Sequence, residues 1–389
     1  MKHVAYLIPT LDRIGGAEQQ VILLASGLAK KGWRVSVIAL SGTGGNAKER
    51  LQSVGIHFSS LHMRKGLADL RGWIRLSRWM KFNRPDVVHA HLPHASLLAR
   101  WSRIAAPVRV LIDTIHSPAR GGFARKFAYR ISGFLPDVVT AVSRAARETW
   151  LRSGMVNEAK LSIIPNGVDL DYWKSDRKAC DAMRQELGLS DEFLWLAVGR
   201  LDPVKDHATL LRAFSKLPAN ARLVIVGEGP LRSQLNDLVK ALALGDRVLF
   251  PGFQIDVLRW MRAADGFVLS SQWEGLPIAL LEASACELPA VITDIPGARE
   301  VLSSVPCTPV AAVGNADSLA ASMNTVMRLP KKDRSEIGRR LRGSVVERFS
   351  LDVVLNRWEE LYGTLLESNP QPSRFGGTRS ARDRILQLQ

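Results

Sequence analysis

Short apolar runs alternate along the chain with longer segments in which apolar residues recur at helical spacing. In the first half, each run precedes a helical pattern, and the runs cover residues 4–10, 33–40, 56–61, 85–91, 108–116 and 137–143. The second half repeats this order with runs at residues 193–199, 222–230, 247–253 and 266–271. Strands that alternate with helices of this length predict an α/β fold with parallel sheets covered on both faces. Ligands of such sheets bind at the carboxyl ends of the strands.

The alternation is interrupted at the turn Pro165-Asn166-Gly167 and the polar stretch that follows it. We therefore expect two Rossmann-like domains, at residues 1–168 and 169–349. Three helical patterns follow the last predicted strand, at residues 315–328, 331–348 and 350–366. Residues 367–389 are polar and rich in arginine, and we expect them to form a flexible tail.

Residues 270–286 hold two carboxylates on either side of a predicted helix start. The helix begins at Pro277, so Glu274 lies before it and Glu282 lies on its second turn. Proline suits the first helical position because its missing N–H costs nothing there, and the free N–H groups at a helix start attract anions. A phosphate at this helix start, with hydroxyl-rich groups on both sides, would satisfy all of these parts. The stretch thus predicts a nucleotide-sugar site, although a solvated pair of acids is an equal alternative for this motif alone.

Two further strand ends carry residues that suit a phosphate. Arg200 and Lys205 follow the strand at 193–199, and two cations can neutralise a diphosphate without a metal. Gly15 and Gly16 follow the first strand, where a backbone without side chains can approach a ligand closely. A solvated charged loop and a plain tight turn are the alternatives at these two places. The glycine turn does not have the G-x-G-x-x-G pattern, which disfavours NAD.

Three histidines in the sequence HAHLPH invite comparison with a metal site. Their spacing nearly matches that of binuclear metallohydrolases, but Pro93 stands where an aspartate is required. We expect one of His89 and His91 to face the ligand at a strand end, and the other histidines, including His94, to pack. His116 ends another strand and is the better candidate for an active-site residue.

Asp169 and Asp171 form a D-x-D pattern, which binds a metal in other nucleotide-sugar enzymes. Because the pattern follows a turn and not the end of a phosphate-binding strand, we interpret it as the start of a helix or turn. We therefore expect no metal site, no essential metal and no other required cofactor.

The charge of the chain is concentrated in its first half. Lys and Arg number 53 against 37 Asp and Glu, a net charge of +16. Residues 1–165 hold 25 basic and 9 acidic residues, whereas residues 166–389 hold 28 of each. Such an imbalance indicates an anionic partner for the first half. Nucleic acid is disfavoured because the chain has no zinc-finger spacing, basic zipper or aromatic RNA-binding signature.

Several features favour the cytoplasm. No apolar run approaches the ~20 residues of a membrane span. The first apolar run reaches Asp12 too early for a signal peptide. The three cysteines are odd in number and widely spaced, which argues against a disulfide framework.

Two segments of the first half combine basic and aromatic residues, as membrane-interface helices do. We expect them to form an acceptor and membrane face made of Arg71, Trp73, Arg75 and Arg78 (within 67–83) and Arg125, Lys126 and Arg130 (within 121–134). Each basic residue near anionic lipid adds on the order of 1 kcal/mol of binding. The protein would then lie on the inner face of the cytoplasmic membrane. Ordinary surface helices with a buried apolar stripe are the alternative.

Five motifs occur in a fixed order: GGAE (15–18), IPNGVD (164–169), VGRLDPVKDH (198–207), VGEGP (226–230) and EGLPIALLE (274–282). In this combination the chain resembles the retaining glycosyltransferases of family 4, which share the two-domain glycosyltransferase-B (GT-B) fold. The resemblance implies two Rossmann-like domains that face each other across a cleft. It also implies a last helix that crosses back to the first domain.

The resemblance assigns roles to the second-half residues. Glu274 would contact the donor sugar, and Glu282 the ribose hydroxyls. Arg200 and Lys205 match the pair that binds the donor diphosphate. The backbone that approaches the sugar and phosphate matches Gly275, Leu276 and Pro277.

In the first half, Gly15 and Gly16 match the loop that faces the donor phosphate. His116 resembles the histidine next to the transferred sugar, so the implied catalytic set is His116, Glu274, Arg200 and Lys205. The implied activity is transfer of a sugar from a nucleotide sugar, with UDP favoured over GDP-mannose, to a lipid-linked or glycan acceptor in cell-surface polysaccharide or glycolipid synthesis. A nucleotide-sugar 2-epimerase of the same fold and a catalytically silent nucleotide-sugar-binding subunit are the alternatives.

Overall fold

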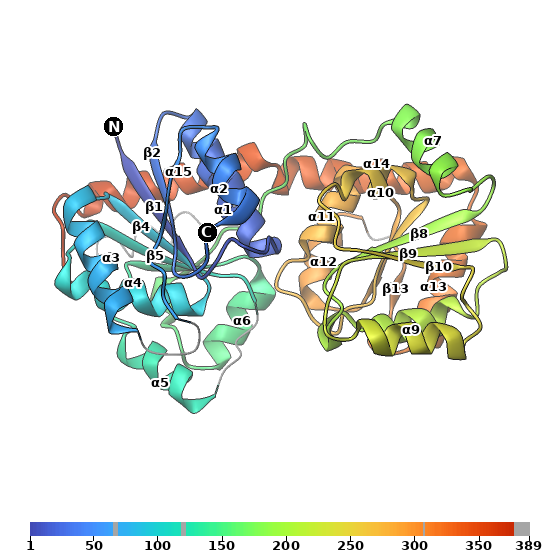
Figure 1. Ribbon diagram of the computed structural model, residues 1–389, viewed down its shortest axis with the longest axis horizontal. Helices are drawn as coiled ribbons and strands as arrows, with labels where there is room; N and C mark the ends of the chain where they lie inside the picture. Colours follow the sequence, from blue (N-terminus) through green and yellow to red (C-terminus); the bar gives the residue numbers. More distant parts are fainter. Residues whose placement is uncertain (65–68, 118–121, 306–307, 377–389) are drawn as a thin grey trace. The chain divides into compact units, whose positions relative to one another are not determined.

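The computed structural model describes residues 1–64, 69–117, 122–305 and 308–376. The chain divides into two compact units (Figure 1). Unit 1 comprises Met1–Gly167 and the chain from Leu351 onward, and unit 2 comprises Val168–Ser350. Both boundaries lie within one residue of the positions expected from the sequence.

Unit 1 is built on a seven-stranded parallel sheet with the order β3-β2-β1-β4-β5-β6-β7. Its strands are β1 (His3–Ile8), β2 (Arg34–Ala39), β3 (His57–Ser60), β4 (Val87–His91), β5 (Val110–Ile115), β6 (Val138–Ala141) and β7 (Leu161–Ile163). Its helices are α1 (Gly16–Lys30), α2 (Gly45–Gln52), α3 (Leu70–Asn83), α4 (Pro93–Ala105), α5 (Phe123–Ile131), α6 (Arg144–Arg152) and α15 (Leu351–Ser368). The order reverses between β1 and β4, and open α/β sheets bind ligands beyond the strand ends at such a reversal.

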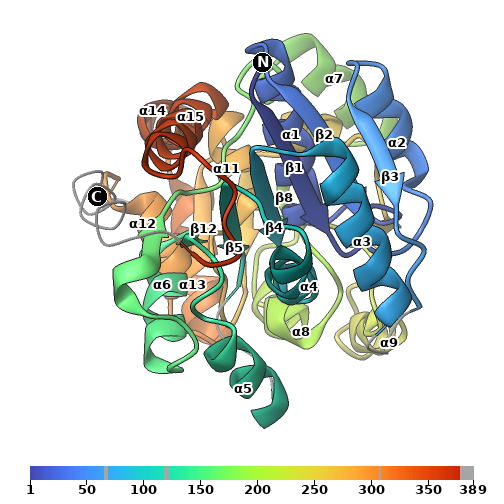
Figure 2. The ribbon, with the colours of Figure 1, turned by 90° about the vertical axis from the view of Figure 1, so that its left-hand side faces the viewer.

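Alternate residues of β1 enter two separate hydrophobic cores. Val4, Tyr6 and Ile8 pack in the core that contains α1 and α15, and Ala5 and Leu7 pack in the core that contains α3 and α4. The two pairs of helices therefore cover opposite faces of the sheet (Figure 2). Burial on both faces explains why the strands are continuous apolar runs and do not alternate with polar residues.

Unit 2 repeats this plan with a six-stranded parallel sheet of order β10-β9-β8-β11-β12-β13. Its strands are β8 (Phe193–Val198), β9 (Ala221–Val226), β10 (Val248–Gly252), β11 (Gly266–Leu269), β12 (Ala290–Thr293) and β13 (Val310–Ala311). Its helices are α7 (Arg177–Glu186), α8 (His207–Phe214), α9 (Arg232–Ala241), α10 (Leu258–Ala263), α11 (Ile278–Ala285), α12 (Pro296–Leu302), α13 (Ala316–Arg328) and α14 (Lys331–Phe349). The order reverses between β8 and β11, so the loops after these two strands are neighbours.

Helix α15 returns the chain to unit 1 and packs against α1. The approach is so close that a Cβ atom on Gly27 of α1 would lie 2.4 Å from Cδ1 of Leu355. At the edge of this contact, Glu359 forms an ion pair with Lys31 (2.6 Å) and accepts a hydrogen bond from the indole of Trp33 (3.0 Å). The helix expected to cross back to the first domain thus belongs to its core.

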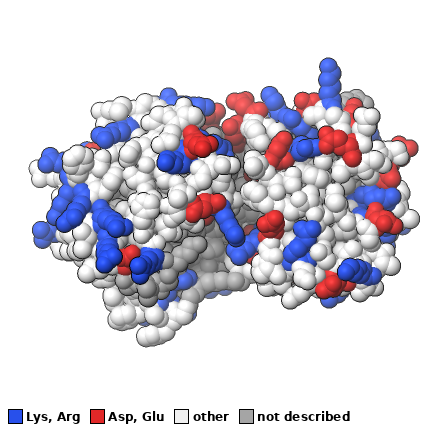
Figure 3. Space-filling view, viewed as in Figure 1, with Lys and Arg blue, Asp and Glu red and all other residues white. Residues whose placement is uncertain are grey.

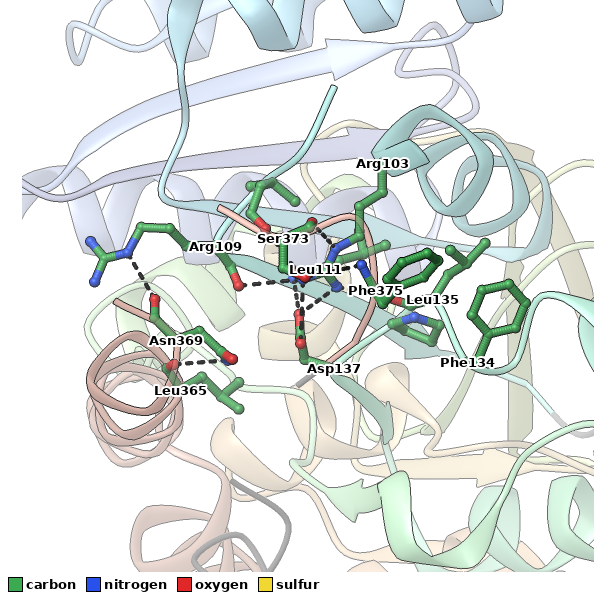
Figure 4. A network of polar contacts seen from close by, with 12 residues as sticks. Arg103, Arg109, Leu111, Phe134, Leu135, Asp137, Leu365, Asn369, Ser373 and Phe375 are labelled. Carbon is green, nitrogen blue, oxygen red and sulfur yellow. Dashed lines mark hydrogen bonds and ion pairs between the residues drawn. The ribbon is translucent and has the colours of Figure 1, made fainter. Parts of the chain in front are cut away.

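The segment after α15 corrects the expectation of a flexible tail from residue 367. Arg109 donates hydrogen bonds to the carbonyls of Leu366 (2.9 Å) and Asn369 (3.1 Å), and the amide of Gly376 donates to Phe134 (3.1 Å). Figure 4 shows the contact of Arg109 with Asn369 together with the carbonyl of Ser373, which accepts from the buried Arg103 (2.9 Å). Residues up to 376 are therefore part of unit 1, whereas 377–389 lie outside the described residues.

A buried ion pair anchors this segment. Arg103 of α4 pairs with Asp137, which precedes β6, at 2.6 Å, and both side chains are almost fully buried. A local sequence pattern does not reveal such a partner, because the polar residues 369–376 read alone as a solvated tail.

In the described part of the chain, no helix is both long and apolar enough to cross a lipid bilayer.

Candidate active site

The loops that follow β8 and β11 bring two of the predicted donor-binding residues together. The ammonium group of Lys205 forms an ion pair with the carboxylate of Glu274, and Ser271 donates a hydrogen bond to the same carboxylate oxygen (2.8 Å). The side chains of Lys205 and Glu274 are only 20% and 15% exposed. The cation predicted for the diphosphate and the acid predicted for the sugar therefore face the same place at this edge of the sheet.

The turn that presents Lys205 is held by its own side chains and by the neighbouring loop. Asp202 caps a short 3-10 helix, Pro203–Lys205, by accepting hydrogen bonds from the amides of Val204 (3.2 Å) and Lys205 (3.3 Å). Ser270 donates to the carbonyl of Lys205 (2.8 Å), which ties the turn to the end of β11. Arg200 begins the turn with its side chain 69% exposed, so it can reach a ligand without breaking a close contact.

Helix α11 begins one residue later than predicted. Pro277 is the residue that precedes the first helical residue, Ile278, and its backbone is extended. The difference has little chemical consequence, because proline supplies no N–H group at either position. Gly275 and Leu276 form the loop between Glu274 and this helix start, as the motif predicted.

Glu282 lies on the second turn of α11 and is largely buried. Burial raises the pKa of its carboxyl group to about 8. Among the described residues, none donates a hydrogen bond to this carboxyl group. The thiol of Cys286 lies one turn further along the helix, and burial and the Glu282 charge raise its pKa to about 12. A buried acid that keeps its proton at neutral pH is costly and is typical of a ligand-binding position.

In unit 1, Gly15 ends the turn between β1 and α1, at the strand-order reversal, and Gly16 is the first residue of α1. Glu18 accepts a hydrogen bond from the amide of Gly15 (3.1 Å) and so caps its own helix. A Cβ atom on Gly15 would lie 2.9 Å from that carboxylate oxygen, so glycine keeps the cap compact. Burial raises the pKa of Glu18, although the backbone amides oppose the shift.

The four histidines near the ends of β4 and β5 have different environments. His89 and His91 are fully buried, and His91 Nδ1 lies 2.8 Å from His116 Nε2. His94 was expected to pack but is exposed on the first turn of α4. Burial lowers the pKa of His89 and His91 well below the ordinary value and lowers that of His116 to about 4. These imidazoles are therefore neutral at pH 7.

Two family models match the chain. The model described as Glycosyltransferase Family 4 matches residues 14–172, and the model described as Glycosyl transferases group 1 matches residues 181–342. The chain belongs to the family 4 glycosyltransferases. The matched regions include every candidate residue named above.

Curated relatives of this family 4 chain include two bacterial enzymes. The UDP-Gal:alpha-D-GlcNAc-diphosphoundecaprenol alpha-1,3-galactosyltransferase of Escherichia coli is 30% identical over 59% of this chain and 63% of that protein. The N-acetylgalactosamine-N,N'-diacetylbacillosaminyl-diphospho-undecaprenol 4-alpha-N-acetylgalactosaminyltransferase of Campylobacter jejuni is 29% identical over 63% of this chain and 65% of that protein. The chain thus matches slightly less than two thirds of the length of each relative.

Solved structures establish the fold of this family 4 member as GT-B. The crystal structure of Anabaena HepE in complex with UDP and glucose superposes with a TM-score of 0.84 at 20% sequence identity. The alignment covers 94% of this chain and all of that chain.

The structure adds a residue that the sequence analysis missed. Gly297, near the start of α12, packs so closely against the Glu274 loop that a Cβ atom would lie 2.5 Å from the carbonyl oxygen of Gly275 and 2.7 Å from that of Glu274. The candidate site therefore depends on a third turn that follows a strand, the turn after β12. The sequence Ile295-Pro296-Gly297, a proline-glycine turn directly after a strand, is the signal that could have revealed it.

The predicted acceptor and membrane face divides into two unlike helices. In α3, Arg71, Arg75 and Arg78 are exposed, Trp73 is half-buried, and an apolar stripe enters the core, so this helix also fits the ordinary surface alternative. Residues 67–68 and 121 of the two predicted segments lie outside the described residues.

Over unit 1, Lys and Arg side chains predominate on the face shown in Figure 3, whereas over unit 2 both charges are mixed.

Helix α5 differs because its two phenylalanines face outward. Phe123 is 84% exposed and Phe127 is 53% exposed, and their stacked rings have centroids 6.2 Å apart. Lys126 and Arg130 are exposed on the same short helix, and Arg125 is half-buried. Tyr129 alone is buried, where its ring contacts the guanidinium group of Arg100 at 4.4 Å.

No group of three His, Cys, Asp or Glu side chains within the described ranges is arranged to hold a metal ion. Asp169 is part of a turn, where it accepts hydrogen bonds from the amides of Asp171 (3.0 Å) and Tyr172 (3.2 Å). Cys180 and Cys286 are free thiols, and Cys307 lies outside the described residues.

Proposed function

We propose that this chain transfers a sugar, with retention of anomeric configuration, from a UDP-linked donor to a lipid-linked or glycan acceptor in cell-surface polysaccharide or glycolipid synthesis. The observation that carries the proposal is the convergence of Lys205 and Glu274 on two neighbouring strand ends, directly before the start of α11. Membership of family 4 supports the reaction class. The name of the Escherichia coli relative specifies UDP-Gal, and the names of both relatives specify diphospho-undecaprenol acceptors, which supports the choice of substrates.

The residues suit the charge changes of such a transfer. The sugar develops oxocarbenium character as the bond to the diphosphate breaks, and negative charge gathers on the departing diphosphate. Lys205, Arg200 and the N-terminus of α11 would stabilise that charge in place, the kind of preorganised electrostatics that contributes most in many enzymes. A departing phosphate oxygen can accept the proton of the acceptor hydroxyl, so no side-chain base is needed. Glu274 would hold the sugar, Glu282 the ribose, and Gly15, Gly16 and His116 would have the roles that the resemblance implies.

We further propose that the protein binds an anionic membrane surface through α3 and α5. The exposed phenylalanines of α5 suit the interfacial region of a bilayer, and the exposed arginines and lysine of both helices suit its anionic head groups. A lipid-linked acceptor would be reached at that surface.

The proposal is tested by a calorimetric screen of UDP, GDP and ADP with and without Mg²⁺, followed by a turnover assay with the matching sugar nucleotides. We expect UDP to bind in the presence of EDTA, and UDP release to require a polyprenyl-diphosphate sugar or glycan acceptor. Interconversion of the donor sugar without an acceptor would indicate an epimerase. Tight nucleotide binding without any turnover would indicate a silent subunit, and both results would overturn the proposal.

A further inference from the structure

A glycine-rich loop lies between β2 and α2, outside the candidate site described above. Gly42, Gly44 and Gly45 have φ values of 87°, 88° and 45°, a backbone region that favours glycine. Because β2 pairs with β1 in parallel, this loop leaves the same edge of the sheet as the turn that ends at Gly15. A glycine-rich loop between a strand and a helix is typical of a phosphate site.

This loop holds the carboxylate of Asp12, which belongs to the turn between β1 and α1. Oδ1 of Asp12 accepts hydrogen bonds from the amides of Thr43 (2.9 Å) and Gly44 (2.8 Å). The hydroxyl of Thr43 lies 3.5 Å from the same oxygen. Successive amides that point at one place form a concavity for an anion. In this chain the anion is a side chain of the neighbouring turn.

The second oxygen of the same carboxylate is enclosed just as closely. A Cβ atom on Gly42 would lie 2.0 Å from Oδ2 of Asp12, so only glycine permits this approach. The carbonyl of Gly42 accepts a hydrogen bond from the hydroxyl of Ser60 (2.7 Å), the last residue of β3. Asp12 therefore connects the turn after β1 to the loop after β2, and Ser60 connects that loop to β3.

Asp12 lies three positions before Gly15 in the turn that carries the predicted phosphate-facing glycines. The second half of this turn is held by two other contacts. Ile14 packs against the hydrophobic core, and Glu18 accepts from the amide of Gly15 (3.1 Å). The carboxylate of Asp12 attaches the first half of the turn to the neighbouring loop.

The location of this contact favours a role in ligand geometry over a role in stability. Asp12 and Thr43 are both exposed, so their hydrogen bonds compete with water and add little to the core. Both loops lie beyond the carboxyl ends of neighbouring strands, where open α/β sheets bind their ligands. A displacement there would alter the position of Gly15 more than it would alter the folding of unit 1.

We propose that Asp12 is a positioning residue that occupies the glycine-rich loop and so fixes the turn in which Gly15 and Gly16 meet the donor diphosphate. The effect on the donor rests on the proposed function, whereas the connection between the two loops does not. Asp12 itself would not touch the diphosphate. The glycine-rich loop would bind a side chain of its own unit and not a phosphate of the donor.

The test compares Asp12→Ala with Asp12→Asn. Asparagine keeps an oxygen that can accept from both amides, whereas alanine removes it. Hydrogen exchange of the Thr43 and Gly44 amides, measured by NMR of nitrogen-15-labelled protein, reports on the contact directly. We expect these amides to exchange about tenfold faster in Asp12→Ala, because hydrogen bonds to a charged group are lost. Asp12→Asn should keep exchange rates close to those of the parent.

Activity provides the second readout. Asp12→Ala should lower kcat about 10- to 100-fold, because a small misplacement of a group that contacts the reacting part of the substrate has effects of this size. UDP affinity should stay close to that of the parent, since Arg200 and Lys205 belong to unit 2. Asp12→Asn should retain most of the turnover. Glu49→Ala is the matched control, because it removes an exposed acid from α2, directly after the same loop, and should behave like the parent.

Gly42→Ala removes the same contact from the opposite side. Its methyl group would displace the carboxylate, so kcat should fall as it does in Asp12→Ala. The double variant should then be no slower than Gly42→Ala alone, since both changes act on one contact and are not additive. Losses that multiply in the double variant would show that the two residues act independently, which would overturn the proposal.

The remaining outcomes separate the contact, its role and the proposed function. Unchanged exchange of the Thr43 and Gly44 amides in Asp12→Ala would overturn the connection between the loops. Faster exchange with full turnover would overturn the positioning role, as would a loss of turnover in Asp12→Asn with both amides still protected. Absence of transfer by the parent with every acceptor, together with the expected exchange rates, would instead mean that the proposed function is wrong.

Discussion

Lys205 and Glu274 form an ion pair with each other, although each is assigned to a different part of the donor. The ammonium group of Lys205 is paired with Glu274, and Ser271 holds the same carboxylate oxygen by a hydrogen bond of 2.8 Å. A diphosphate that binds Lys205 must therefore compete with Glu274. This competition separates the binding of UDP from the transfer of the sugar, and the two can be measured independently.

Glu274→Gln should strengthen UDP binding while it abolishes sugar transfer. Glutamine keeps the side-chain volume and can still accept from Ser271, but it no longer competes for Lys205. A partly exposed ion pair is worth up to about 1 kcal/mol, so we expect UDP to bind about two- to fivefold tighter by calorimetry. Transfer should fall about 100-fold or more, since a contact made to the reacting sugar is lost.

The matched variant is Lys205→Met, which should weaken UDP binding and transfer together. If UDP bound Glu274→Gln more weakly than the parent, the competition between the carboxylate and the diphosphate would be disproved. If UDP affinity were unchanged in Lys205→Met, Lys205 would be no part of the diphosphate site.

Glu282→Gln should stabilise the protein and weaken its function. The pKa of Glu282 is about 8 in the folded state, against about 4.3 in an unfolded chain. Between these values the unfolded state binds fewer protons than the folded state, so Glu282 lowers stability progressively as pH rises from about 4.3 to 8. Glutamine removes this loss but cannot offer a carboxylate to the ribose hydroxyls.

The check for Glu282 is a series of thermal unfolding scans from pH 5 to pH 9. The melting temperature of Glu282→Gln should approach that of the parent near pH 5 and exceed it at pH 8. A difference of about 1–3 kcal/mol, the usual cost of an unsatisfied buried polar group, would correspond to several degrees. Equal melting temperatures at pH 8 would show that Glu282 is solvated. Cys286 has a pKa of about 12 and does not titrate in this window.

Gly297→Ala should displace the Glu274 loop and so disturb the proposed donor site. The new methyl group would lie 2.5 Å from the carbonyl oxygen of Gly275, so the Glu274 loop must move. Overpacking of this kind costs about 1–3 kcal/mol of stability, and we expect weaker binding of the sugar nucleotide as well. Gly343→Ala in α14 is the control, because a Cβ atom there meets nothing within 4 Å and alanine favours a helix. Parent-like donor affinity in Gly297→Ala would mean that the loop tolerates the displacement.

The architecture and much of the candidate site could be predicted because they depend on local patterns. The helices expected at 315–328, 331–348 and 350–366 correspond to α13, α14 and α15 within two residues at each end. Apolar periodicity and turn residues determine such elements within a short window. Lys205 and Glu274 were both expected near strand ends, which lie at one edge of a parallel sheet, but their ion pair was not predicted.

The remaining features depend on contacts between distant residues. Gly297 matters because of the carbonyl of Gly275, the segment after α15 is ordered by Arg103, and the hydroxyl of Tyr362 lies 2.7 Å from Nδ1 of His89. Each partner is more than 20 positions away, so no local pattern reveals it. A histidine near a strand end likewise reads the same in the sequence whether it is buried, as His89 of β4 is, or exposed, as His94 of α4 is.

Replacement of Lys126 and Arg130 by glutamate should release the protein from anionic vesicles. Both residues are exposed on α5, whose phenylalanines point outward, and each basic residue contributes about 1 kcal/mol at an anionic surface. The double variant should therefore bind phosphatidylglycerol vesicles at least about 30-fold more weakly in sedimentation assays at constant ionic strength. Lys240→Glu is the control, since Lys240 is also exposed but lies in unit 2, whose charges are balanced. Binding that persists in the double variant and in Phe123→Ser would exclude α5 from the membrane surface and leave α3, whose apolar stripe is already buried, with a purely electrostatic contact.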